Sequence, residues 1–204
     1  MTTDTADRAL HREPPAIIAG DAAAPAQLRA WRDADRADFA AMNADPSVMR
    51  FFPALLTREQ SDTAVDRFVG HHEQHGFGLW ALEVDGSFAG FVGLATATFD
   101  APFTPAVEIG WRLAQWAWGH GYASTAATRV LQAARDEFGI RDVVSFTAAV
   151  NAPSIAVMRR IGMSHDEAGA FEHPRVPEGN PLRPHVLYRW SADHSRTGIE
   201  TVPR

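Results

Sequence analysis

The residues best suited to chemistry lie between Glu108 and Thr125. A short alternating stretch, Glu108-Ile109-Gly110-Trp111-Arg112-Leu113, is followed by Trp118-Gly119-His120-Gly121-Tyr122-Ala123-Ser124-Thr125. This pattern predicts a strand that runs through a glycine-bounded turn into a helix. The first N–H groups of a helix have no intrahelical partner and lie at the positive end of its dipole, so a phosphate can accept hydrogen bonds from them. Gly119 and Gly121 lack a Cβ atom, which permits positive φ and a close approach to a ligand. We predict that the turn holds an anion.

A second group of candidate ligands is the histidine set His71, His72 and His75. His71 and His75 are spaced i, i+4 and could meet on one helix face, and imidazole is a common metal ligand. No further ligand residue stands out nearby, as a metal site would require. We therefore favour a solvated helix end before Gly76, helped by the negative end of the helix dipole.

Composition limits the classes of protein to which the chain can belong. Its 204 residues, 46% hydrophobic, suit one α/β domain with a full core. The formal charge of −6, without a run of Lys or Arg, argues against a nucleic-acid partner. The absence of cysteine excludes disulfides, thiolate metal sites and a Cys nucleophile. The apolar runs are too short for a membrane span, and the first residues do not resemble a signal peptide, so we expect a soluble cytoplasmic protein without a membrane partner.

We expect the chain to divide into a mobile N-terminal arm (1–26), one domain (27–190) and a C-terminal tail (191–204). Hydrophobic periodicity, caps and turns predict the order of elements in the domain. The expected elements are a strand at Gln27–Arg32, a helix capped by Asp33, a helix opened by the capping box Thr57–Gln60, a hairpin of Leu79–Val84 and Phe88–Ala95 about Asp85-Gly86, a strand at Val107–Leu113, a helix from Gly121 to Phe138, a strand at Val143–Val150, a helix from Pro153 to Gly162, and a final pair, Ser164–Phe171 and His185–Trp190. Alternation places Glu108 on the face opposite the apolar set of its strand.

This order of elements, the Trp-Gly-His-Gly-Tyr-Ala turn, and Asn151-x-x-Ser154 followed by Arg160-Ile161-Gly162-Met163 resemble the GNAT acetyltransferases, in particular their RimJ/RimL-type branch. The resemblance implies an α/β (α+β) fold: a mixed, mostly antiparallel sheet of about seven strands flanked by four helices. In that fold the fourth and fifth strands splay apart around CoA. The implied activity is transfer of an acetyl group from acetyl-CoA to a primary amine, without a metal.

The resemblance also assigns cofactor contacts. Backbone amides of the turn are expected to cradle the CoA pyrophosphate, and the backbone of Trp111 to Leu113 is expected to bind the pantetheine arm. Asn151 is expected to bond to the same arm, or else to turn the chain into the next helix. Trp116 stands where the general family has Gln or Arg, so main-chain amides would carry more of the pyrophosphate binding. The expected cofactor-binding residues are Trp111, Arg112, Leu113, Gly119, His120, Gly121, Tyr122, Ala123, Ser124 and Asn151.

The reaction requires a base for the ammonium group, a donor to the carbonyl oxygen and an acid for the departing thiolate. Glu108 is the candidate base, directly or through water, unless it only pairs with a neighbouring Arg. Ser154 is the candidate acid, unless it only caps the helix. Many GNAT enzymes use a tyrosine at the position of Met158, and methionine cannot donate a proton. His173 is an alternative base, because histidine titrates near neutral pH.

The acceptor residues are the hardest to infer. Trp80, Trp111, Phe103 and His173 are candidates for an amine pocket, because aromatic faces attract cations; a packing role is the alternative for each. We expect the acceptor to be a protein N-terminus or a small amine, with a homodimer left open. A non-catalytic acyl-CoA-binding or sensor module is the rival hypothesis. A dinucleotide-binding domain is disfavoured, because no Gly-x-Gly-x-x-Gly motif or acidic ribose partner is present.

Overall fold

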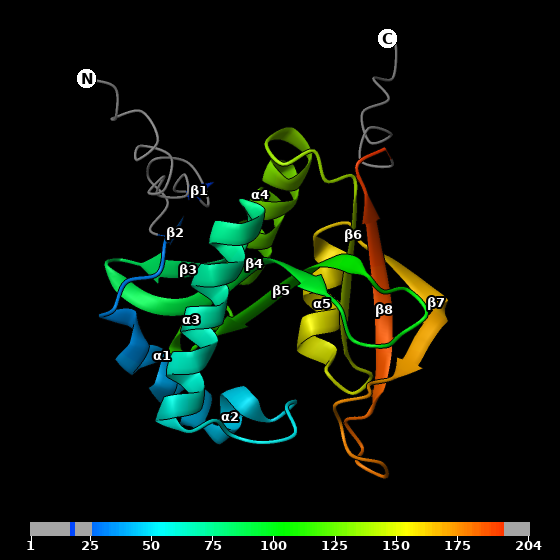
Figure 1. The fold of residues 1–204 in the computed structure, drawn as a ribbon, viewed down its shortest axis with the longest axis horizontal. Coiled ribbons are helices and arrows are strands. Elements are labelled where there is room, and N and C mark those ends of the chain that lie inside the picture. The colour runs from blue at the N-terminus through cyan, green and yellow to red at the C-terminus, as the bar shows by residue number, and fades with distance from the viewer. Residues whose placement is uncertain (1–16, 19–25, 194–204) are drawn as a thin grey trace, which may run out of the picture.

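The computed structural model describes residues 17–18 and 26–193, and within them eight strands form one sheet (Figure 1). The elements are β1 (Ile17–Ile18), β2 (Ala26–Arg29), α1 (Asp35–Ala44), α2 (Pro46–Met49), α3 (Arg58–His75), β3 (Leu79–Val84), β4 (Ser87–Ala97), β5 (Ala106–Leu113), the 3₁₀ turn η1 (Gln115–Ala117), α4 (Tyr122–Asp136), β6 (Asp142–Ala148), α5 (Ala152–Arg160), β7 (Ser164–Glu172) and β8 (Pro184–Ser191). The strand order is β1-β2-β3-β4-β5-β6-β8-β7. Every pair is antiparallel except β5–β6, which confirms a mixed, mostly antiparallel α/β sheet.

Helices cover the two faces of this sheet with separate cores. On one face, Leu82 and Ile109 pack with Ala126 and Val130 of α4. On the other face, Phe39 of α1 and Val65 of α3 pack with Ala81 and Phe91. Successive strand residues point to opposite faces, so Leu82 and Ala81 contribute to different cores. Two layers of helices therefore enclose the sheet, with α1 to α3 over the β3–β4 half and α5 beside the β6–β8 half (Figure 1).

Several local predictions are confirmed. Asp85 and Gly86 take φ values of 48° and 78°, as a type I′ hairpin requires. Thr57 and Gln60 form both halves of the capping box that opens α3. A Cβ atom at Gly93 would overlap the backbone of Gly78, which explains a glycine at that point of β4.

The central feature for function is the short contact between β5 and β6. β4 pairs with β5 along its whole length, whereas the parallel partner β6 is in register only where Glu108 lies opposite Val144. The Ser145 hydroxyl donates to the carbonyl of Ile109 at 2.9 Å and reinforces this point. Beyond this pair, the edge of β5 that faces β6 has no strand partner from Gly110 to Leu113 among the described residues. This agrees with the splay expected of β5 and β6.

Several boundaries differ from the sequence prediction: β2 ends at Arg29 instead of Arg32, and β6 ends at Ala148 instead of Val150. Ala34, not Asp33, precedes α1, and buried Asp35 is bonded by Arg29. The short helix α2 follows Asp45-Pro46, where we expected only a helix end, because the Asp45 carboxylate caps it through Ser47 N–H. Helix α4 ends at Asp136, before Phe138. Apart from β1, Ala26 and residues 191–193, the N-terminal arm and the C-terminal tail lie outside the described residues.

Candidate active site

The glycine turn leads into α4 with its donors unobstructed. Gly119 and Gly121 both have φ of 81°, and a Cβ atom at either would meet no other atom within 4 Å. Gly121 is the N-cap, no side chain caps the helix, and the first turn carries no acidic residue. The first intrahelical bond runs from Thr125 N–H to Gly121 O at 3.0 Å. The amides of Tyr122, Ala123 and Ser124 therefore lie before that bond, in the arrangement that binds an anion.

Arg160 adds a positive charge to this turn. The last residue of α5, it donates from Nη1 to Ser124 Oγ at 3.0 Å. Sequence reasoning assigned Arg160 no role, since the contact joins residues far apart in the chain. Ser124 lies in the first turn of α4, so the guanidinium stands beside the same helix N-terminus. An anion at this turn would meet both main-chain donors and a cation.

Glu108 is a half-buried carboxyl group at the point where β5 and β6 last pair. Burial raises its pKa to about 8, and the nearby positive charge of Arg175 opposes that shift. Its neighbour Ile109 is fully buried against α4, so alternation turns Glu108 toward the opposite face, as predicted. A carboxyl group with this pKa can exchange a proton with an amine near neutral pH.

Beside Glu108 lies a group of six rings, which we call the aromatic cluster. It consists of Phe99, Phe103, Phe146, Phe171, His173 and His185. Phe103 lies 5.0 Å from Phe171 and His173 lies 4.8 Å from His185, centroid to centroid. Arg175 stacks over Phe99 at 5.9 Å and also acts on the pKa of Glu108, which places the cluster next to the carboxyl group.

His173 does not titrate near neutral pH as we expected. Burial lowers its pKa to about 4, with further lowering by His185 and Arg175. Its Nδ1 accepts the backbone N–H of Arg175 at 3.2 Å, so the neutral ring carries its proton on Nε2. His173 is therefore a weak base, poorly suited to replace Glu108.

The structure places Trp80 in the core instead of an amine pocket. Trp80 is 1% exposed and stacks on Phe138 at 6.1 Å. It is in register with Val92, which is in register with Trp111, so all three side chains share the face covered by α4. Glu108 points to the other face. We expected Trp80 and Trp111 to line an acceptor pocket with Glu108. This expectation is wrong, because the strand register directs both indole side chains to the opposite face.

Asn151, and not Ser154, caps α5. Its Oδ1 accepts the N–H of Ser154 at 3.3 Å, and its Nδ2 donates to Thr147 Oγ1 at 2.8 Å. The half-buried Ser154 hydroxyl makes no hydrogen bond with any residue that the structure describes. Met158 is 1% exposed and belongs to the core. Ser154 thus keeps a free hydroxyl, while Asn151 has a structural role whatever else it binds.

Arg112 points to the same face of β5 as Glu108, a position that sequence reasoning treated only as a backbone contact. Its Nη1 donates to Asn43 Oδ1 at 2.6 Å, and its guanidinium lies 4.0 Å from the centre of the Phe52 ring. Its Nε is buried without a partner. Burial lowers its pKa to about 10, so the group remains a cation at neutral pH.

His71 and His72 of α3 are half-buried and pack against other side chains, whereas His75 is exposed at the helix end before Gly76, where we predicted a solvated end. His71 accepts the Thr96 N–H at Nε2 and meets the Phe77 carbonyl through Nδ1, which must carry the proton. His72 packs edge-on against Trp80 at 5.2 Å.

Within residues 17–18 and 26–193 no group of three or more His, Cys, Asp or Glu side chains could hold a metal ion. No helix of this part of the chain is long and apolar enough to cross a membrane.

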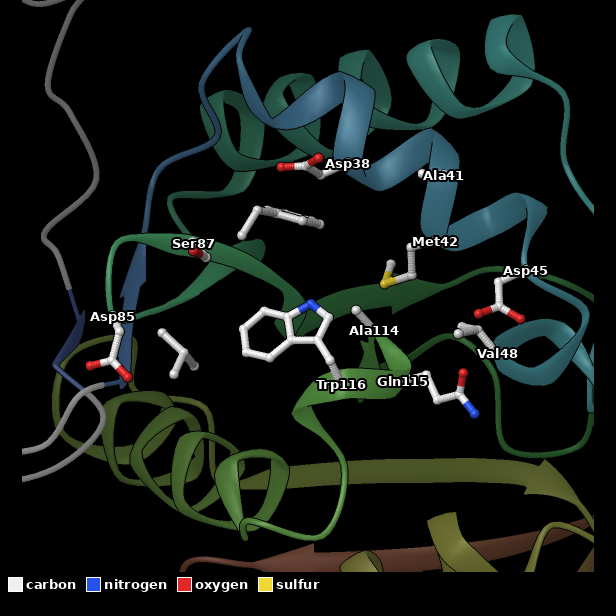
Figure 2. Close-up of a pocket in the computed structure, with 12 residues that line it drawn as sticks. Asp38, Ala41, Met42, Asp45, Val48, Asp85, Ser87, Ala114, Gln115 and Trp116 are labelled. Carbon is white, nitrogen blue, oxygen red and sulfur yellow. The ribbon is translucent and has the colours of Figure 1, made fainter.

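A cavity of about 680 Å³ lies apart from Glu108, between α1, the β3–β4 turn and η1. Figure 2 shows Trp116 in its middle, with Asp85 on one side and Asp45 on the other. Trp116 is 52% exposed and lines this cavity. Its side chain is therefore directed toward α1.

Comparison with known proteins identifies the family. Residues 26–164 match the family model described as an acetyltransferase (GNAT) domain. The chain belongs to the GNAT acetyltransferase family. It is 33% identical over 108 residues to FsC-acetyl coenzyme A-N(2)-transacetylase of Aspergillus fumigatus, which covers 51% of this chain and 46% of that protein. The chain thus matches about half the length of that relative.

Two solved structures illustrate the likeness of fold. RimJ of Mycobacterium smegmatis, in complex with CoA-disulfide, has a TM-score of 0.66 at 19% identity and covers 83% of each chain. The Salmonella typhimurium acetyltransferase described as modifying the N-terminal serine of ribosomal protein L7/L12 has a TM-score of 0.68 at 18% identity. It covers 86% of this chain and 98% of its own. These similarities support the GNAT fold predicted from the sequence.

Proposed function

We propose that the protein is an acetyl-CoA-dependent N-acetyltransferase of the RimJ/RimL type, in which a primary amine attacks the acetyl group directly. The observation that carries this proposal is the position of Glu108, a carboxyl group at the single β5–β6 register pair, where burial raises its pKa to about 8. A base works best when its pKa lies near the operating pH. Family membership makes acetyl transfer the reaction, and Glu108 gives it a base for the ammonium proton.

The chain's residues fit acetyl-CoA in two places. The uncapped start of α4 and Arg160 suit the pyrophosphate. The unpaired edge of β5 at Trp111 to Leu113 suits an extended arm that carries amide groups. The Asn151 side chain already caps α5 and binds Thr147, so we expect its contribution to cofactor binding to be small.

When bound, acetyl-CoA supplies the activated acetyl group. Glu108 takes a proton from the substrate ammonium, which frees the nitrogen lone pair to form the new N–C bond. A main-chain N–H between Trp111 and Leu113 donates to the carbonyl oxygen. As the C–S bond breaks, the attacking nitrogen releases its second proton to solvent, the Ser154 hydroxyl gives its proton to the departing sulfur and takes one back from solvent, and Glu108 returns its proton to solvent before the next turnover. Phe103 and His173 form part of the wall beside Glu108 that receives the acceptor.

The acceptor is a primary amine of a protein N-terminus or of a small molecule. Similarity to the enzyme described as modifying the N-terminal serine of L7/L12 supports a protein N-terminus as acceptor. Similarity to the FsC transacetylase supports a small-molecule amine. A cytoplasmic location, where acetyl-CoA is available, belongs to this proposal, and a homodimer is left open.

The test is to mix purified protein with acetyl-CoA and a panel of amines and to follow the release of free CoA thiol. Turnover that falls in Glu108→Gln, with unchanged CoA affinity, supports the proposal. Unchanged turnover in Glu108→Gln removes Glu108 as the base. Tight CoA binding without turnover of any amine would support the rival, a non-catalytic acyl-CoA sensor.

A further inference from the structure

Arg112, half-buried with its Nε shielded from solvent, lacks the counter-charge that the buried Arg29 has. Arg29, 8% exposed, is held by two carboxylates: Asp35 binds both of its terminal nitrogens at 2.7 and 2.8 Å, and Glu83 binds Nε at 2.7 Å. Arg112 has only a neutral amide, Asn43 Oδ1. No carboxylate of the described residues forms an ion pair with Arg112. A buried cation without a counter-charge is costly, and an anion bound beside it would offset that cost.

The unpaired part of Arg112 is one edge of its guanidinium. Phe52 and Phe91 approach the group at 4.0 and 5.6 Å from their ring centres, and Asn43 occupies Nη1. Asn43 is itself fully buried and held by Ser61 Oγ at 3.1 Å, so the guanidinium is fixed in place. Nε has no partner, and Nη2 makes no hydrogen bond in the part of the chain described. Nε and Nη2 together form the fork that binds a carboxylate or phosphate with two hydrogen bonds.

Gly110 leaves room for a small group between this fork and the candidate base. Glu108, Gly110 and Arg112 share one face of β5, because strand side chains alternate. At Gly110 an added Cβ atom would meet only Glu108 Oε1, at 3.7 Å, besides its chain neighbours. The Cα atoms of Glu108 and Arg112 are four strand residues apart, about 13 Å. A ligand lying over Gly110 would have the carboxyl group at one end and the guanidinium at the other.

We propose that Arg112 selects the acceptor by binding an anionic group, a carboxylate or a phosphate, that the amine substrate carries several bonds away from its nitrogen. This inference rests on the proposed N-acetyltransferase function, and it names the acceptor class that the function leaves open. The lowered pKa of Arg112 agrees with a group that is desolvated without an anionic partner. Phe52, 37% exposed, covers one face of the guanidinium.

Matched acceptors test the proposal. Three pairs differ only in the anion: 6-aminohexanoate and 6-aminohexanamide, O-phosphoethanolamine and ethanolamine, and short peptides beginning Ser-Glu and Ser-Gln. We expect kcat/KM to favour the anionic member of at least one pair by about tenfold or more, since a hydrogen bond to a charged group is stronger than a neutral one. The pair whose anionic member has the higher kcat/KM shows whether the anionic group belongs to a small carboxylate, a phosphate or an acidic peptide. Equal kcat/KM within all three pairs overturns the proposal.

Variants tie the preference to Arg112. In Arg112→Gln the ratio of kcat/KM between anionic and neutral acceptors should fall to about one, and Arg112→Lys should keep part of it, since the charge stays while the fork is lost. Asn43→Asp places a carboxylate at Nη1 and should also reduce the ratio. Arg135→Gln, which removes an exposed guanidinium paired with Asp136 on α4, is the matched control. A ratio that is unchanged in folded Arg112→Gln overturns the proposal.

A binding experiment separates this inference from the proposed function. The CoA-bound protein is titrated with glutarate and with inorganic phosphate, and the thermal unfolding midpoint is measured. The turn before α4 also attracts anions. The midpoint is therefore compared between the wild type and Arg112→Gln, because only binding at Arg112 is lost in that variant. A rise in midpoint in the wild type that Arg112→Gln lacks supports the anion site even if no amine is acetylated. Equal rises in both proteins, or no rise in either, overturn it even if acetylation occurs.

Discussion

A Cβ atom at Gly110 would lie 3.7 Å from Glu108 Oε1, an ordinary van der Waals contact. The fold therefore has room for a side chain at a point where the sequence provides none. We predict that Gly110→Val folds normally but lowers kcat/KM for the acceptor by about tenfold to hundredfold, because it fills space that the substrate needs. Gly110→Ala should have a smaller effect. Gly70→Ala in α3, where an added Cβ meets no atom within 4 Å, controls for the loss of a glycine. Full activity in Gly110→Val would place the acceptor elsewhere.

Glu108 should control the pH dependence of turnover. A base with a pKa of about 8 is mostly protonated at pH 6, so kcat/KM should rise with pH and level off above about pH 8. Glu108→Gln should lower turnover about a hundredfold or more and lose this rise, apart from the part due to the amine itself. The measurement is CoA release from pH 6 to 9.5. A parallel profile in the variant would assign the proton transfer to another group.

The same carboxyl group should make stability depend on pH. Its pKa in the folded protein is raised from 4.5 to about 8, so the folded state binds this proton more tightly than the unfolded state does. Its contribution to stability is therefore fully present below pH 4.5 and is lost as the pH rises toward 8. Relative to the wild type, Glu108→Gln should become more stable over this window. Urea unfolding of both proteins at pH 5 and pH 8.5 checks the sign.

His173 should make the protein sensitive to acid. Its pKa is lowered from 6.5 to about 4, so the folded state resists protonation and stability falls as the pH drops through that interval. His173→Phe keeps a ring against Phe99 and His185 but cannot titrate. We expect this variant to lose less stability than the wild type between pH 7.5 and pH 5, measured by urea unfolding. A larger loss in the variant would contradict the assignment.

Asn151 should contribute more to folding than to catalysis. Its side chain caps α5 through Ser154 N–H, so Asn151→Ala should cost about 1 kcal/mol of unfolding free energy. Asn151→Asp keeps the capping oxygen and should recover most of that loss. Thermal unfolding measures the first effect and CoA titration the second. A large loss of CoA affinity in a variant of normal stability would show that the side chain serves the cofactor.

The sequence predicted best those features that short segments specify alone. The Asp85-Gly86 turn, the capping box of Thr57 and the positive φ of Gly119 and Gly121 depend on a few neighbouring residues. The direction of Glu108 followed from alternation along β5. For these elements local chemistry and tertiary structure favour the same conformation.

Features that depend on register or on long-range contacts were missed. Trp80 lies in register with Val92 on β4, and Val92 lies in register with Trp111 on β5, so all three face α4. The residues next to Trp80 in the sequence do not specify this register. Arg112 meets Asn43 across 69 residues of sequence. The aromatic cluster draws its rings from the β4–β5 loop, β6 and the β7–β8 hairpin, so only the assembled sheet brings them together. Aromatic and arginine residues are compatible with both a core and a binding site, and composition alone does not separate the two.

The single register pair between Glu108 and Val144 also has a mechanical consequence. The strands β1 to β5 and the strands β6 to β8 form two half-sheets whose backbones are joined by one short contact. Glu108 and Arg112 belong to the first half, whereas Phe146, Phe171 and His185 of the aromatic cluster belong to the second. An extended molecule that pairs with the free edge of β5 would act as a removable strand between the halves. Cofactor binding would then stiffen the joint across which the acceptor is held.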